Sequence, residues 1–309
     1  MKVAIVQSKP RKGQVEENIA QLGAIFAQLA GEEPAYDLIV LPEAALTGYF
    51  LEGAVYDLAF ESEALAERLG GLWRAASPPR AVRPVAIVLG FYENAGGTYY
   101  NSAFYVEIGS ASQRIVHVHR KMFLPTYGVF DEERFVSRGR RLEAFESRLG
   151  RMALLICEDA WHAIMPTLAA IKGARVLIVP SASPGRGFAA PGELESVRYW
   201  RDVLRSYAAE HGVFVLYAGL AGFEGGKGMA GSSCAIDPFG DVVGTLPALG
   251  EHVLKVQLDL DDVEIARARL PLLGDLAAVL PDLLGSVSSG SAAQRAELSG
   301  SPALQRGEP

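Results

Sequence analysis

The sequence predicts a mixed α/β fold in which strands and helices alternate along the chain and form stacked layers. Short runs rich in valine, isoleucine and leucine recur throughout, and segments with a helical spacing of apolar residues fall between them. Half of the residues are hydrophobic, so a chain of 309 residues can bury a large core. Alternation of the two patterns over the whole length favours a layered α/β or α+β architecture.

The predicted strands are of two kinds. Solid apolar runs, such as residues 37–41 (DLIVL) and 176–181 (VLIVPS), are typical of strands that are buried on both faces. Residues 114–120 (RIVHVHR) alternate instead, which indicates a strand with one face toward the core. The predicted strands cover residues 3–7, 37–41, 85–92, 101–108, 114–120, 152–156, 176–181, 213–218, 232–237 and 252–259.

The first predicted helix covers residues 15–30. Its apolar side chains recur at the three- and four-residue spacing that places them on one helical face. These side chains are Ile19, Leu22, Ile25, Phe26 and Leu29. The other predicted helices cover residues 62–76, 163–172 and 193–211.

No internal segment has the composition of a linker between domains. Residues 77–80 (SPPR) and 225–231 (GGKGMAG) are the expected flexible loops. From about residue 285 the chain is dominated by serine, glycine, alanine, glutamine and arginine, which is typical of a disordered segment. We therefore expect one domain, residues 1–284, followed by a disordered tail, residues 285–309.

Charge and cysteine content exclude several classes of protein. A formal net charge of −7 argues against nucleic-acid binding, which would require a basic stripe. The two cysteines, Cys157 and Cys234, are too few for a disulfide framework or a four-thiolate zinc site. The first apolar run is too short for a signal peptide, and no stretch is apolar for long enough to span a bilayer. We therefore expect a cytoplasmic protein with no nucleic-acid or membrane partner.

Three apolar runs end in a chemically reactive residue. Glu43 follows DLIVLP, Lys121 follows RIVHVHR, and Cys157 follows MALLI. Sites in open α/β sheets gather beyond the carboxyl ends of strands, so these three side chains can converge there. Each has an ordinary alternative explanation, as a solvated turn glutamate, a surface lysine and a small buried cysteine. The combination of the three points to a site.

A carboxylate, an ammonium group and a thiol together suit nucleophilic attack on an amide. Glu158 and Asp159 directly follow Cys157, and their charge would hold its thiol protonated. We expect Lys121 to offset this repulsion and, with a backbone N–H, to stabilise an oxyanion. We expect Glu43 to take the thiol proton and later to activate water. Ammonia then leaves, and a thioester remains for hydrolysis.

Histidine patterns suggest two other kinds of chemistry. His117 and His119 lie on one face of a predicted strand and could bind a metal, but the sequence offers no evident third ligand. His162 follows Cys157 closely and could form a Cys–His pair, although no orienting Asn or Asp is evident. We expect no metal and no cofactor, and we interpret Cys234 as a buried strand cysteine.

The motifs resemble the nitrilase, or carbon–nitrogen hydrolase, superfamily over nearly the whole predicted domain. The matching segments are MKVAIVQSKP, EENIAQL, DLIVLPEAALTGY, HRKMFLP, LLICEDAWH, VLIVPSAS and SSCAIDPFGDVV. The stretch RKMFLPTYGVFDEERFVSRG, followed by ICEDAW, is most similar to the glutaminase portion of glutamine-dependent NAD synthetases. The resemblance implies a four-layer α-β-β-α sandwich and a homodimer or higher homo-oligomer. It also implies a catalytic triad of Glu43, Lys121 and Cys157.

Further site residues follow from the same resemblance. Many relatives have a second glutamate close to the triad; Val129 occupies its commonest position in amidases, and the glutaminase-like pattern indicates Glu132 instead. Glu132 would orient Lys121 or the amide nitrogen. The candidate substrate-binding residues are Tyr49, Tyr127, Phe130, Glu158, Trp161 and Ser183. The alternatives for binding a substrate carboxylate are Arg186, Arg198 and Arg201.

We expect the chain to hydrolyse a linear amide to a carboxylic acid and ammonia. No segment resembling the ATP-pyrophosphatase domain of NAD synthetases follows the predicted domain, which favours a stand-alone amidase. The alternatives are a glutaminase subunit that supplies ammonia to a separate synthetase, a nitrilase, and an inactive member that binds a metabolite or partner protein. Intact Glu43, Lys121 and Cys157 favour an enzyme, because a binding protein has no need of all three.

Overall fold

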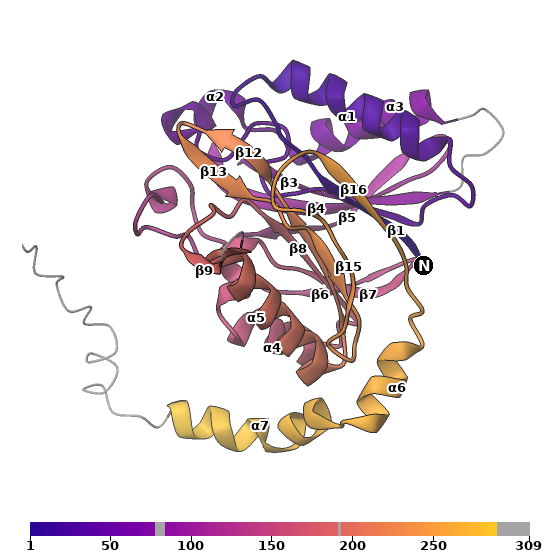
Figure 1. Ribbon diagram of the computed structural model, residues 1–309, viewed down its shortest axis with the longest axis vertical. Coiled ribbons are helices and arrows are strands. Elements are labelled where there is room, and N and C mark those ends of the chain that lie inside the picture. Colours follow the sequence, from indigo (N-terminus) through magenta and orange to yellow (C-terminus); the bar gives the residue numbers. More distant parts are fainter. Residues whose placement is uncertain (78–83, 191–192, 289–309) are drawn as a thin grey trace, which may run out of the picture.

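Two six-stranded sheets pack face to face between two layers of helices (Figure 1). The structure is a computed structural model that describes residues 1–77, 84–190 and 193–288. Its layered α/β architecture confirms the predicted fold class, and the order of the layers is the α-β-β-α sandwich that the sequence resemblance implied. Among the described residues, no helix is long and apolar enough to cross a membrane.

The first sheet carries the first half of the chain. Its order is β16-β1-β2-β3-β4-β5, so the last strand of the fold pairs with the first. Strands β1, β2 and β3 are parallel, whereas β3, β4 and β5 form an antiparallel meander. The strands are β1 (Lys2–Gln7), β2 (Leu38–Val40), β3 (Val85–Ala95), β4 (Thr98–Ile108), β5 (Gln113–Arg120) and β16 (His252–Gln257).

The second sheet carries the second half in the order β15-β14-β11-β8-β7-β6. Its central strands β7, β8 and β11 are parallel, and antiparallel strands complete both edges. The strands are β6 (Ala144–Ser147), β7 (Gly150–Leu154), β8 (Val176–Ser181), β11 (Phe214–Gly219), β14 (Cys234–Ile236) and β15 (Val242–Thr245). The carboxyl ends of β2, β7 and β8 each lead directly into a residue of the site described below.

Strand alternation divides the apolar side chains between two cores. In β1, Val3 and Ile5 belong to the core between the sheets, whereas Ala4 and Val6 face the helices α1 (Val15–Ala30) and α3 (Ser62–Ala76). The two helices contact each other through Phe26 and Trp73, whose rings pack edge to face with centroids 5.4 Å apart. Helices α4 (Ile164–Ile171) and α5 (Glu195–His211) cover the outer face of the second sheet.

Several short elements escaped sequence prediction, because they are too brief to show a periodic pattern. They are the 3-10 turns Glu52–Ala54, Glu132–Arg134 and Cys157–Trp161, helices α2 (Val55–Leu58) and α6 (Asp262–Arg269), and strands β6, β9 (Phe188–Ala190), β10 (Glu193–Leu194), β12 (Ala221–Glu224), β13 (Lys227–Ala230) and β15. Strand β13 lies inside one of the loops expected to be flexible. Of the other, residues 77–80, only Ser77 lies within the described ranges.

The C-terminal helix differs from the sequence prediction. Helix α7 covers Leu272–Ser288 and packs against α4 and α5. Residues 285–288, which the sequence assigned to a disordered tail, are therefore helical. The glycines and the internal Pro281 obscure the helical pattern in this segment, and contacts with two other helices override these weak helix formers. The remainder of the predicted tail, residues 289–309, lies outside the described residues.

Candidate active site

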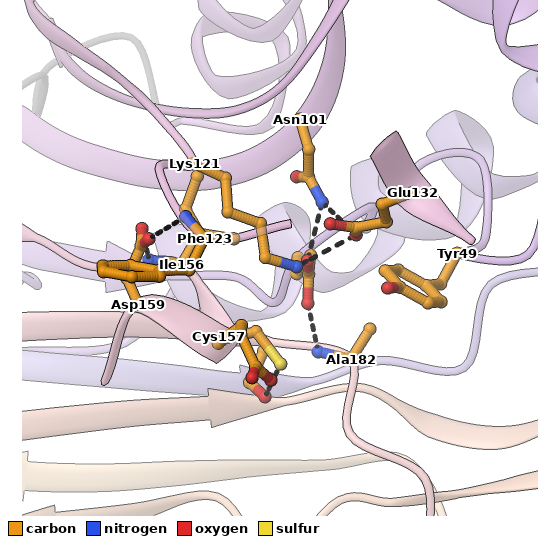
Figure 2. Close-up of polar contacts among 12 residues, drawn as sticks. Tyr49, Asn101, Lys121, Phe123, Glu132, Ile156, Cys157, Asp159 and Ala182 are labelled. Atoms are coloured by element: carbon orange, nitrogen blue, oxygen red, sulfur yellow. Dashed lines mark hydrogen bonds and ion pairs between the residues drawn. The ribbon is translucent and has the colours of Figure 1, made fainter. Parts of the chain in front are cut away.

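Lys121 lies at the centre of a buried cluster of charged groups (Figure 2). It follows β5, and its side chain is fully buried. Its Nζ donates to Glu43 Oε1 at 2.8 Å and to Glu132 Oε1 at 2.9 Å. Asn101 Nδ2, from β4, donates to the same two oxygens at 2.7 and 2.9 Å. Two donors therefore hold two carboxylates together, and the ammonium group has a single defined position.

Glu43 connects the two sheets. It follows β2, and its Oε2 accepts a hydrogen bond of 2.7 Å from the backbone N–H of Ala182, which follows β8 in the other sheet. A close backbone approach also fixes its position. A Cβ added at Gly90 of β3 would lie 2.5 Å from Glu43 Cα, so only glycine fits there without a shift. The carboxylate is held by strand ends from both sheets.

Cys157 begins the 3-10 turn after β7, where the chain turns sharply. Its φ is +45°, a left-handed conformation that side-chain-bearing residues rarely adopt. Such strain persists only where the surrounding structure enforces it, and it is common at functional sites. The Ser181 hydroxyl donates to Cys157 Sγ at 3.2 Å. The turn thus places the thiol beside the strand end that also holds Glu43.

Asp159 joins the cysteine turn to the segment that carries Lys121. Its Oδ1 accepts the backbone N–H groups of Met122 and Phe123, both at 3.0 Å. Its Oδ2 accepts the N–H of Ile156 at 3.1 Å and lies 2.9 Å from Nε2 of His119. One fully buried carboxylate therefore sets the distance between the candidate nucleophile and the lysine.

The electrostatics favour a protonated thiol at rest. Burial and the Glu43 carboxylate raise the pKa of the Cys157 thiol, and Lys121 only partly offsets them. Burial alone would lower the pKa of Lys121, but Glu132 and Glu43 raise it well above its ordinary value. Burial also raises the pKa of Glu132, against the effect of Lys121. The ammonium group is retained, while the thiol needs a base in order to react.

A small aromatic cavity of about 60 Å³ adjoins the charged cluster. Tyr49 and Glu132 lie in its wall, and the Tyr49 ring centroid is 5.5 Å from Lys121 Nζ. Phe50 and Phe130 stack in the same wall with ring centroids 6.3 Å apart. Pockets that bind small molecules usually measure roughly 300–1,000 Å³, so this cavity alone is too small for a ligand the size of glutamine.

Comparison with protein families identifies the chain. The family model described as carbon–nitrogen hydrolase matches residues 2–268, which include every described group of the charged cluster. The chain belongs to the carbon–nitrogen hydrolase family. This family membership supports a hydrolase, in agreement with the resemblance seen in the sequence.

Curated relatives of this carbon–nitrogen hydrolase are glutamine-dependent NAD(+) synthetases. The protein from Rhodobacter capsulatus is 32% identical over 262 residues, which are 84% of this chain and 43% of that protein. The protein from Thermotoga maritima is 29% identical over 262 residues, 85% of this chain and 42% of that protein. The chain thus spans less than half the length of these relatives. The matches confirm the resemblance to the synthetases inferred from sequence motifs.

Solved structures share the fold. A carbon–nitrogen hydrolase from Helicobacter pylori G27 superimposes with a TM-score of 0.79 at 24% identity, covering 92% of this chain and 98% of that one. An amidase from Nesterenkonia sp. gives a TM-score of 0.68 at 26% identity, covering 87% of this chain and 94% of that one. These likenesses confirm the nitrilase-type architecture predicted from sequence.

The two acids that follow the cysteine of this carbon–nitrogen hydrolase do not act as the sequence suggested. Asp159 is bound to backbone N–H groups and His119, and both oxygens of Glu158 accept from the hydroxyl of Tyr127 at 3.0 Å. Neither is a main cause of the raised pKa of Cys157, which comes from burial and Glu43. The predicted repulsion was therefore assigned to the wrong carboxylates.

The remaining substrate-binding candidates are dispersed. Tyr49 and Phe130 line the small cavity beside Glu132, but Tyr127 is about half exposed and lies outside its wall. Trp161 stacks on Tyr199 with centroids 4.3 Å apart. Ser183 is buried, and its carbonyl accepts the N–H of Ala230.

The three arginines considered for binding a substrate carboxylate lie in different surroundings. Arg186 is exposed, with its guanidinium carbon 5.7 Å from the Phe130 ring centroid and 5.9 Å from that of Trp161. Arg198 is exposed on α5, and Arg201 on the same helix lies 3.8 Å from Asp202. Arg186 therefore lies beside two of the predicted pocket residues, Phe130 and Trp161.

Sequence reasoning missed three polar side chains of the site. Asn101 was placed only at the start of a strand, Asp159 only as a source of repulsion, and Ser181 only at the end of a strand. Each is a polar residue at a strand end or just beyond an apolar run, which was the one available signal. Their partners are distant in sequence, so no local pattern could pair them.

The two histidines considered for metal binding have other surroundings. His119 pairs with Asp159, whereas His117 stacks on Phe145 with centroids 4.7 Å apart. Burial lowers the pKa of His117 to about 4. Within the described ranges, no group of three or more His, Cys, Asp or Glu side chains is arranged to hold a metal ion.

Proposed function

We propose that this carbon–nitrogen hydrolase converts a linear, non-peptide amide into a carboxylic acid and ammonia through a thioester on Cys157. The observation that carries the proposal is the position of Lys121, whose Nζ contacts Glu43 and Glu132 at 2.8 and 2.9 Å. A retained ammonium group beside a base and a thiol matches what acyl transfer from an amide requires.

The first step is attack of Cys157 sulfur on the amide carbonyl carbon. Because burial and Glu43 raise the pKa of the thiol, the proton moves to Glu43 as the carbon–sulfur bond forms. The carbonyl oxygen becomes an oxyanion, and the ammonium group of Lys121 and the backbone N–H that follows Cys157 stabilise it. Glu132 keeps Lys121 charged and oriented throughout the step.

The remaining steps of the proposed reaction release both products. Glu43 delivers its proton to the amide nitrogen, the carbon–nitrogen bond breaks, and ammonia leaves a thioester behind. Glu43 then takes a proton from water as the hydroxyl adds to the thioester carbon. Collapse of this intermediate breaks the carbon–sulfur bond, returns the proton to Cys157 and frees the carboxylic acid.

Glutamine is the second candidate substrate. The curated relatives are named glutamine-dependent NAD(+) synthetases, and the chain matches less than half of their length. A chain of this kind would release ammonia from glutamine for a separate synthetase. A nitrile would undergo the same attack through a thioimidate, but the named relatives favour amides.

Ammonia release from a panel of amides tests the proposal. The panel contains glutamine, asparagine, short aliphatic amides, ω-amido acids and N-carbamoyl compounds, with a nitrile for comparison. Cys157→Ala should abolish release, whereas Cys234→Ala, which removes the other buried cysteine, should retain it. Mass spectrometry of the enzyme quenched during turnover should show an acyl adduct on Cys157.

The outcomes separate the alternatives. Release from aliphatic amides supports an amidase, and strong preference for glutamine supports the ammonia-supplying subunit. If Cys157→Ala keeps activity within about tenfold of the wild type, Cys157 is not the nucleophile. If the folded wild-type protein releases ammonia from no compound of the panel, the result would favour an inactive family member that binds a metabolite or partner.

A further inference from the structure

A second hollow lies on the opposite face of the first sheet from the charged cluster, at the ends of β4 and β5. Along these strands Tyr100, Val118 and Arg120 point outward, whereas the Asn101 side chain points to the site. The hollow measures about 430 Å³, within the range of small-molecule pockets. Its lining residues are Tyr100, Val118, Arg120, Arg138, Gly139, Arg140 and Arg141. We call this hollow the arginine pocket.

The wall of the arginine pocket is anchored to the sheet. The guanidinium of Arg120 forms two hydrogen bonds with Glu93, at 2.8 and 2.9 Å, and lies 4.1 Å from the Tyr100 ring centroid. The backbone N–H of Gly139 donates to the carbonyl of Lys121 at 2.7 Å. A Cβ at Gly139 would lie 2.0 Å from the Arg120 carbonyl oxygen, so the chain here is pressed directly against the end of β5.

Positive charge in the arginine pocket exceeds its neutralising charge. Glu93 neutralises Arg120, and Arg141 interacts electrostatically with Glu143. Within residues 1–77, 84–190 and 193–288, neither Arg138 nor Arg140 forms an ion pair, and both are exposed. Like charges gathered in this way repel one another. A surplus of positive charge at one place also contrasts with the net charge of the chain, which is −7.

We propose that the arginine pocket binds the phosphate group of a small phosphorylated molecule. Guanidinium groups present paired N–H donors that match phosphate oxygens, and they remain charged at any physiological pH. The pocket is concave and confined to one sheet edge, which fits a compact anion better than an extended polymer. The negative net charge of the chain also disfavours a nucleic-acid polymer.

Binding at the arginine pocket is independent of the proposed hydrolysis. The guanidinium groups lie on the outer face of the sheet, whereas the side chain of Lys121 is buried with Glu43 and Glu132 on the inner side. A binding measurement therefore stands whether or not the chain hydrolyses any amide. Conversely, loss of phosphate binding would leave the proposed chemistry untouched.

Isothermal titration calorimetry of the full chain tests the proposal, at constant ionic strength. The probes are inorganic phosphate, pyrophosphate and ADP, with sodium chloride as the reference. The variant R138Q/R140Q removes the two unpaired arginines. The control R11Q/R114Q removes two arginines from exposed ion pairs elsewhere, so both variants have the same net charge. Melting temperatures establish that both variants fold.

We expect saturable binding of at least one phosphate probe by the wild type. R138Q/R140Q should weaken it by about tenfold or more, because each lost charge-assisted bond contributes strongly, whereas the control should stay within about twofold. Tighter binding of ADP than of pyrophosphate would identify the ligand as a nucleotide. Equal affinity for the two would show that the pocket recognises the phosphate group alone. No saturable binding of any phosphate probe, or equal weakening of binding in both variants, would overturn the proposal.

Discussion

At the scale of single residues, the site depends on buried charges that satisfy one another. Lys121 and Glu43 are fully buried, a situation that is unfavourable for either alone. Asn101 donates to both carboxylates and the Ala182 N–H donates to Glu43, so the cluster gains hydrogen bonds from neutral donors beside the ion pairs. Removing any member leaves a buried charge without its partner, and each should therefore matter for both folding and rate.

Replacement of Lys121 by Met should lower kcat by at least ~10², because the oxyanion loses its ammonium partner. The melting temperature should also fall, since two buried carboxylates lose their counter-charge. Steady-state kinetics with the amide hydrolysed by the wild type measures the first effect. Lys172→Met, which removes a surface lysine paired with Glu143, is the control. A raised KM with unchanged kcat would contradict the role given to Lys121.

Asp159→Asn should disturb the position of the cysteine turn relative to the segment that carries Lys121, without removing a group that takes part in the reaction. The amide nitrogen of Asn donates and cannot accept, so Asn can accept fewer of the three backbone N–H groups that Asp159 binds. Unfolding in urea should show a loss on the order of 1–3 kcal/mol, with a large fall in kcat and a smaller change in KM. Asp202→Asn on the surface of α5 should change neither. An unaltered kcat in Asp159→Asn would show that the carboxylate does not position the site.

At the scale of elements, segments that follow the carboxyl ends of strands supply four groups of the site. Glu43 follows β2, Lys121 follows β5, Cys157 follows β7 and Ala182 follows β8. Parallel strands direct these ends to one edge, and the face-to-face packing of the sheets brings the two sets together. The site therefore depends on how closely the strand ends approach one another.

Gly90→Ala tests that approach. The added Cβ would meet Glu43 Cα at 2.5 Å and the Pro42 carbonyl oxygen at 2.7 Å, so the loop that carries Glu43 must move. Overpacking of this kind usually costs ~1–3 kcal/mol, and a displaced base should lower kcat as well. Gly71→Ala in helix α3, where an added Cβ meets nothing within 4 Å, should be neutral or stabilising. Equal behaviour of the two variants in unfolding and kinetics would refute the argument.

At the scale of the whole molecule, burial of ionisable side chains links stability to pH. Burial lowers the pKa of His117 to about 4 and also lowers that of His211. The unfolded chain titrates its histidines near 6.5, so it binds protons more readily than the folded chain between pH 6.5 and about 4. The stability that neutral His117 contributes is present above pH 6.5 and is lost as the pH falls through that window, and neutral His211 acts in the same direction.

Denaturant unfolding between pH 7.5 and 4.5 should show this loss. His117→Phe keeps a ring to stack on Phe145 and removes one titrating group, so the stability of the variant should fall less over the same range. His252→Gln, at an exposed position, is the control. If His117→Phe follows the wild-type curve at every pH, His117 does not contribute to the acid dependence.

The sequence by itself determined the elements with strong periodicity and the residues with distinctive chemistry. Solid apolar runs marked β2 and β8, helical spacing marked α1, and Glu43, Lys121 and Cys157 stood out at the ends of such runs. Short elements and α7 were not predictable, because they lack a local pattern that outweighs their glycines and prolines.

Only the tertiary structure decided which groups meet. The contact of Glu43 with Ala182, the link from Asp159 to the Lys121 segment, and the clustering of Arg138 and Arg140 beside Arg120 all join residues far apart along the chain or on separate strands. These pairings are set by the stacking of two sheets and by close backbone approaches at glycine. Local sequence patterns encode which face a side chain takes, but they do not encode which distant face it will meet.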